Sequence, residues 1–89
     1  MEQRIELRIE NEAGLHARPA AELVRLAGNF DAEVWLAKDG VEVNAKSIMG
    51  VLMLAAERGA VITLRARGED AEEVVAAVRD LVEKGFGER

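Results

Sequence analysis

The chain of 89 residues contains no cysteine, one proline and one histidine. Without cysteine it can form no disulfide, no thiolate nucleophile and no cysteine-based metal site. No apolar run approaches the roughly 20 residues that a membrane-spanning helix needs. The first residues, MEQRIELRIE, are too charged for a signal peptide. We therefore expect a cytoplasmic protein.

The charge balance is acidic, with 17 Asp and Glu against 12 Lys and Arg and a net charge of −5. This surplus opposes binding to nucleic acids and anionic membranes, because both carry negative charge themselves. Large aromatic side chains are scarce, with one Trp and two Phe, so Val, Leu, Ile and Ala must fill the core. At this length we expect one domain over residues 1–89.

Four segments have the residue pattern of β-strands. Residues 4–10 alternate strictly, with Ile5, Leu7 and Ile9 on one face and charged side chains on the other, which predicts a half-buried strand. β-rich runs follow at residues 32–37, 41–44 and 60–67. Asp39-Gly40 between the second and third runs predicts a tight antiparallel hairpin, because both residues tolerate positive φ.

Three segments have the pattern of helices. The first extends from Pro19 to Gly28-Asn29, where glycine suits a left-handed helix end. The second is capped by Ser47 and runs toward Gly59. The third begins at Asp70, whose spacing from Glu73 fits a capping box, and ends before Gly85. The final FGER reads as a frayed tail.

The resulting order, β-α-β-β-α-β-α, predicts an α+β fold. Strands with one charged face indicate a sheet that is open to solvent on one side and covered by helices on the other. The hairpin must be antiparallel, but the pattern alone leaves the rest of the strand order open.

The stretch AGLHARPAAELVRLAG, residues 13–28, places the single histidine where a glycine turn becomes a helix. Backbone N–H groups are unpaired in a first helical turn, and the positive end of the helix dipole projects there. Such a position disfavours a cationic His16 ring and attracts anions, phosphate above all. Arg18 adds a guanidinium that matches phosphoryl oxygens. This combination suits transient phosphorylation of His16.

Several other kinds of site have no residues to build them. The sequence has no second histidine, no carboxylate cluster with metal-ligand spacing and no Walker-type phosphate loop. We therefore expect no metal and no cofactor. The residues favour a carrier of phosphoryl groups between other proteins over an enzyme with a small substrate of its own.

Two motifs, GLHARPA (14–20) and KSIMGVLML (46–54), resemble the HPr family, the histidine-containing phosphocarriers of the bacterial phosphoenolpyruvate-dependent sugar phosphotransferase system. The resemblance implies an HPr-like open-faced β-sandwich, with a four-stranded antiparallel sheet and three helices on one face. It also implies that His16 accepts a phosphoryl group at Nδ1, the pros nitrogen, from phosphorylated enzyme I. Arg18 would stabilise that group, and the A domain of a sugar-specific enzyme II would receive it.

The resemblance also concerns Ser47. Many relatives are phosphorylated at this serine by an HPr kinase/phosphorylase, which slows phosphoryl transfer and promotes binding to a catabolite-control regulator. A serine here is also a good helix cap and needs no regulatory role, so both interpretations stay open.

The apolar residues near the two motifs exceed what one helix face can bury, so some are expected to contact partners. We expect Leu15 and Met49 in particular to stay exposed, because methionine adapts to several partners. The full set of expected docking residues is Leu15, Ala17, Ala20, Ile48, Met49, Val51 and Leu52. The carrier itself is expected to be a monomer.

One position departs from the family pattern. Relatives often have Ser, Thr or Asn three residues before the histidine, whereas this chain has Ala13. No side-chain hydrogen bond can come from Ala13, so backbone groups or water are expected to orient the imidazole.

Three other functions compete with sugar-linked phosphoryl transfer. One is the nitrogen-related branch of the phosphotransferase system, which shares the chemistry but not the sugar partners. Another is a Crh-type regulatory module, which lacks the phosphorylatable histidine, so His16 argues against it. The third is a small ligand-binding α+β domain of another family, which would leave the LHARP motif unexplained.

Overall fold

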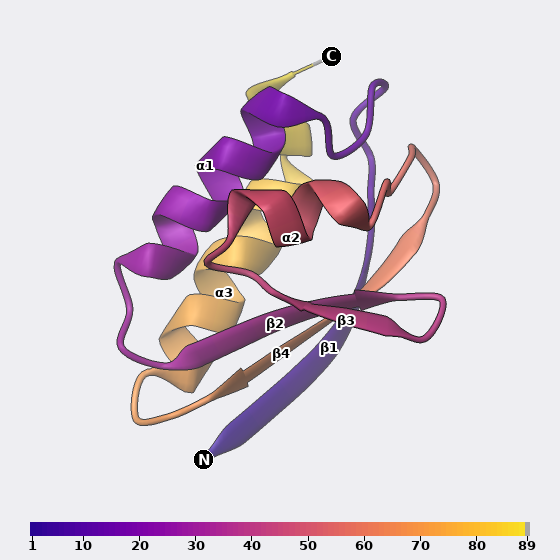
Figure 1. Cartoon of the computed structure of the whole chain (residues 1–89). Helices are drawn as coiled ribbons and strands as arrows, with labels where there is room; N and C mark the ends of the chain where they lie inside the picture. The colour runs from indigo at the N-terminus through magenta and orange to yellow at the C-terminus, as the bar shows by residue number, and fades with distance from the viewer. Residues whose placement is uncertain (89) are drawn as a thin grey trace.

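The four strands form a single antiparallel sheet, and the helices lie on one of its faces (Figure 1). The computed structural model describes residues 1–88. Its elements are β1 (Glu2–Arg8), α1 (Ala17–Gly28), β2 (Glu33–Lys38), β3 (Val41–Asn44), α2 (Ile48–Met53), β4 (Val61–Arg67), α3 (Ala71–Glu83) and a 3-10 turn, η1 (Gly85–Gly87). The predicted α+β fold and element order are confirmed.

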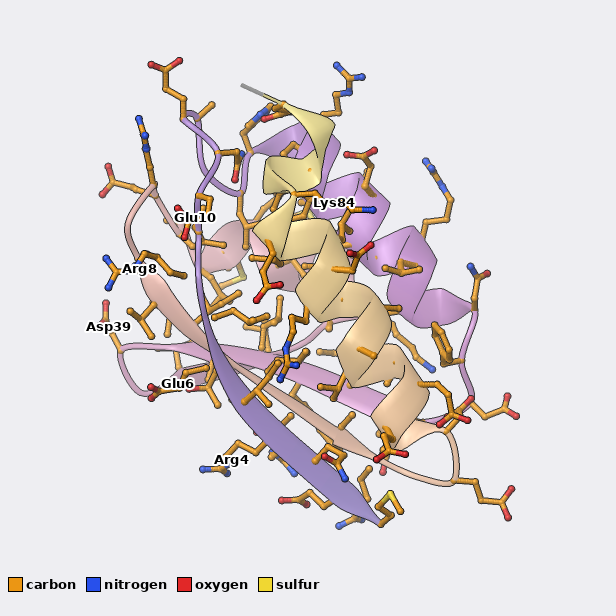
Figure 2. All side chains as sticks on the ribbon, turned by 180° about the vertical axis from the view of Figure 1, so that it is seen from behind. Arg4, Glu6, Arg8, Glu10, Asp39 and Lys84 are labelled. Carbon is orange, nitrogen blue, oxygen red and sulfur yellow. The ribbon has the colours of Figure 1, made fainter. Side chains whose placement is uncertain are left out.

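The strand order is β1-β4-β2-β3, which the sequence pattern left open. Leu7 of β1 pairs with Ile62 of β4, and both side chains are buried under the helices. Arg4, Glu6 and Arg8 alternate with the buried positions and project from β1 on the side away from α3 (Figure 2). Side chains along β1 therefore alternate between the core and the solvent, as predicted.

A cluster around Arg65 lies on the solvent-facing side of the sheet. The guanidinium of Arg65 lies 3.8 Å from the ring centroid of Trp35. The same guanidinium donates to both carboxylate oxygens of Glu42, at 2.9 and 2.8 Å. The ion pairs and the stacking shield the one tryptophan, so this face needs no covering helix.

Two helix ends differ from the prediction. α1 ends without a left-handed glycine, because Asn29 closes it with φ −78°. α2 ends at Met53, well before Gly59, because Ala55 adopts φ +50° and turns the chain. Among the described residues no helix is both long and apolar enough to cross a membrane.

The capping box predicted at α3 is wrong. Asp70 precedes α3, but its side chain makes no cap hydrogen bond. Its carboxylate instead accepts from the backbone N–H groups of Asp31 and Ala32, at 2.8 and 2.7 Å. The hydrogen bond from Asp31 is the main reason that the pKa of Asp70 lies below its usual range. Asp70 therefore fastens the loop before β2 to the start of α3.

The predicted frayed tail FGER is wrong for its first residues, because residues 85–87 form a 3-10 turn, and Arg89 lies outside the described residues. Gly85, Phe86 and Gly87 all have positive φ, at 62°, 58° and 73°. Phe86 tolerates this unusual backbone because its side chain is buried in the core, next to the end of α3. The turn brings Glu88 beside His16 at the start of α1, and Figure 1 shows the turn after α3 next to that helix start.

Candidate functional site

His16 is the N-cap residue of α1, which begins at Ala17, two residues before the start at Pro19 that the apolar pattern predicts. Its backbone is extended, with φ −81° and ψ −169°, and its carbonyl accepts from Ala20 N–H at 3.0 Å. The side chain makes no cap hydrogen bond and is 43% exposed. Among residues 1–88 the N–H groups of Ala17 and Arg18 have no protein acceptor, and Pro19 has no N–H. The exposed imidazole thus borders a helix start that can bind an anion.

The loop before His16 is fastened to the segment that follows α2. Leu15 N–H donates to the carbonyl of Ala56 at 2.8 Å, and the Leu15 side chain is only 4% exposed. Gly14 has φ +73°, and a Cβ there would lie 2.5 Å from the same Ala56 oxygen. Only glycine permits this approach of two backbones. The buried Leu15 and the tight Gly14 contact fix the position of His16.

The side-chain carboxylate of Glu88, near the C-terminus, faces the His16 imidazole. Both carboxylate oxygens of Glu88 lie 3.2 Å from His16 Nε2. The Nδ2 group of buried Asn11 donates to Glu88 Oε1 at 3.1 Å and to the carbonyl of Gly14 at 2.7 Å. One amide therefore links the carboxylate to the loop that carries the histidine.

Burial by itself raises the pKa of Glu88, but other contributions outweigh it. Hydrogen bonds with His16 and Asn11, together with the positive charges of His16 and Arg18, hold the pKa of Glu88 below its ordinary value. Glu88 is therefore an ionised hydrogen-bond acceptor at neutral pH.

Arg18 is exposed in the first turn of α1 and close enough to Glu88 for its charge to act on that carboxylate. No carboxylate of residues 1–88 forms an ion pair with it. An exposed guanidinium without an ion-pair partner among these residues can bind the oxygens of a group attached to His16.

Ser47 is the N-cap of α2, as the sequence predicts. Its Oγ accepts from Gly50 N–H at 3.1 Å. The side chain is half-buried. Ser47 therefore has the structural role expected of it.

The docking residues expected from the sequence divide by burial. Ile48, Met49 and Ala17 are exposed, Met49 at 70%, and Leu52 is half-buried. For Leu15, Ala20 and Val51 the expectation is wrong, because their side chains fill the core between the helices and the sheet. Met53, which the prediction omitted, is 75% exposed.

Sequence reasoning missed two residues of this site, Asn11 and Glu88. A signal for Glu88 was present, since glycine directly after a helix followed by a large apolar residue is typical of an ordered helix end. Gly85 and Phe86 match that pattern. Asn11 gave no signal, because an asparagine in a loop is ordinary turn composition.

Comparison with known proteins decides the family. A family model described as "PTS HPr component phosphorylation site" matches residues 3–84. The chain belongs to the HPr family. Membership makes it a phosphocarrier protein of the phosphotransferase system, which confirms the family predicted from the two motifs. Glu88 lies beyond the matched residues.

Individual HPr relatives agree with this assignment. Phosphocarrier protein HPr of Cupriavidus necator is 49% identical over 80 residues, 90% of either chain. The crystal structure of HPr-C-His from Thermoanaerobacter tengcongensis has a TM-score of 0.95 at 46% identity and covers 98% of both chains. The HPr-like protein Crh of Bacillus subtilis is 44% identical over 84 residues, 94% of this chain and 96% of Crh.

The contact at Gly14 generates a testable prediction. Gly14→Ala combines positive-φ strain, about 1–3 kcal/mol, with a backbone clash. Gly59→Ala is the matched control, since Gly59 has φ +88° and open space around it. Gly14→Ala should lower the melting temperature more than Gly59→Ala and should shift the His16 ring resonances in the NMR spectrum. Equal melting temperatures with unmoved His16 resonances would show that Gly14 does not fix the site.

Proposed function

We propose that His16 accepts a phosphoryl group on Nδ1 from phosphorylated enzyme I and passes it to the A domain of a sugar-specific enzyme II. The observation that carries this proposal is the exposed imidazole at the N-cap of α1, beside two N–H groups and a guanidinium that have no protein partner within residues 1–88. Nucleophile, backbone donors and fixed positive charge thus come from three consecutive residues, His16, Ala17 and Arg18.

His16 is the one residue of this chain that forms and breaks bonds in the proposed transfer. The lone pair of His16 Nδ1 forms a bond to phosphorus, and the bond between phosphorus and the donor atom breaks with its electron pair staying on the donor. Arg18 and the free N–H groups of α1 bind the phosphoryl oxygens. The reverse sequence delivers the group to enzyme II.

The partners dock on the exposed apolar side chains of α2. Ile48, Met49 and Met53 are exposed, and α2 packs beside α1, which carries His16 (Figure 1). A methionine-rich surface can repack against partners of different shape, which suits a carrier that must bind both a donor and an acceptor.

Phosphorylation of Ser47 would regulate this docking. A phosphate at the start of α2 adds roughly −1.5 to −2 charges beside Ile48 and Met49. The helix start tolerates the charge, whereas an approaching acidic partner is repelled. The kinase that places the phosphate and a regulator that recognises it would be additional partners.

The carrier is proposed to act as a cytoplasmic monomer with one domain over residues 1–89. One continuous hydrophobic core underlies the sheet and helices of the described residues, which supports a self-sufficient unit. A similar structure from Thermoanaerobacter tengcongensis is described as an HPr dimer.

Replacing the histidine tests the proposed acceptor. With enzyme I and phosphoenolpyruvate, wild type should gain an acid-labile phosphate, whereas His16→Ala should gain none because it lacks the nucleophile. Glu12→Ala, an exposed change in the same loop, should behave as wild type. Melting temperatures should stay close to one another, because both side chains are exposed. Acid-labile phosphate on His16→Ala would disprove the assignment.

Paired substitutions at Ser47 test the docking surface. Ser47→Asp adds charge and keeps a capping side chain, whereas Ser47→Ala adds no charge and loses about 1 kcal/mol of capping. We expect Ser47→Asp to raise the apparent KM of enzyme I for the carrier several-fold, with a melting temperature at or above that of Ser47→Ala. If the two variants have the same KM, Ser47 is only a helix cap.

A further inference from the structure

We propose that Glu88 is a positioning residue for phosphoryl transfer, which holds the His16 imidazole through Nε2 and leaves Nδ1 free to react. This inference rests on the proposed function of His16 and adds a residue that lies outside the part of the chain matched by the family model.

The contact is made by a carboxylate that is itself held in place. The Glu88 side chain is only 18% exposed, and Asn11 donates to one of its oxygens at 3.1 Å. Both oxygens face His16 Nε2 at 3.2 Å. Asn11 also binds the carbonyl of Gly14, so carboxylate and histidine loop are tied to the same buried amide.

This geometry selects one tautomer of the neutral ring. An ionised carboxylate can only accept hydrogen bonds, so the nitrogen that faces it must carry the hydrogen. With the hydrogen on His16 Nε2, Nδ1 keeps its lone pair. A second group that fixes the tautomer and orientation of a reactive histidine is a common arrangement in proteins. Here that second group is Glu88.

The carboxylate also favours the phosphorylated ring. When Nδ1 bonds to phosphorus, Nε2 keeps its hydrogen and the ring gains a positive charge. Glu88 faces that charge from the side opposite to the new bond, and so stabilises it without meeting the phosphoryl group. When the phosphoryl group passes on, the acceptor supplies the electron pair of the new bond to phosphorus. The P–N pair stays on Nδ1, and the ring is neutral again.

The conformation of residues 85–87 supports this role of Glu88. Phe86 is buried despite φ +58°, and the flanking glycines complete a left-handed turn that aims Glu88 at the start of α1. Ala13 offers the ring no hydrogen bond from within its own loop. The C-terminal turn supplies the contact instead.

The first measurement determines the tautomer of the His16 ring in the unphosphorylated protein. In ¹⁵N-histidine-labelled protein at alkaline pH, the two ring nitrogens report which one carries the hydrogen. Wild type and the control Glu83→Ala, an exposed change at the end of α3, should show hydrogen mainly on Nε2. Glu88→Ala should show a mixture, and Glu88→Gln should restore the wild-type form because its amide oxygen still accepts. An unchanged tautomer in Glu88→Ala would overturn the proposal.

The second measurement is the rate of phosphorylation by enzyme I. Glu88→Ala should lower kcat about tenfold at unchanged KM and melting temperature, the loss expected for one hydrogen bond to a charged group. Glu88→Gln should recover part of that loss. A kcat within about twofold of Glu83→Ala would overturn the role. If wild type itself accepts no phosphate, the proposed function fails, while the tautomer spectra still decide whether Glu88 orients the ring.

Discussion

The position of His16 depends on the burial of the residue before it. Leu15 lies in the core and its N–H binds the carbonyl of Ala56, whereas His16, one residue later, is 43% exposed. The hydrophobic effect thus fixes the backbone at Leu15, and the extended conformation of His16 turns the next side chain outward. Buried Pro19 and Ala20 then set the direction of α1. The core therefore fixes the place and direction of the backbone that carries the imidazole.

In the function that we propose, three tasks are divided among three parts of the chain. The start of α1 supplies the nucleophile and donors for an anion, α2 offers exposed apolar side chains, and the turn after α3 brings Glu88 to the imidazole. These parts are far apart in the sequence and are assembled by packing on one sheet face. Since the residues for each task are already in place, we expect the proposed transfer and docking to occur without rearrangement of the fold.

What the sequence could predict follows from the range of the interactions involved. The alternation around Leu7 and the Asp39-Gly40 hairpin are local patterns, and the structure reproduces them. His16 was also identified locally, from its own helix start. The hydrogen bonds of the Asp70 and Glu88 carboxylates could not be predicted, because each binds a segment far away in the sequence. The burial of Leu15 and Val51 likewise depends on tertiary packing that residue type alone does not reveal.

The most direct test is to identify the nitrogen that carries the phosphoryl group. In ¹⁵N-labelled protein phosphorylated by enzyme I, coupling between ³¹P and ¹⁵N identifies the ring atom bonded to phosphorus. We expect that atom to be Nδ1 of His16, with hydrogen retained on Nε2 beside Glu88. A phosphoryl group on Nε2, the nitrogen that faces the Glu88 carboxylate, would contradict the account.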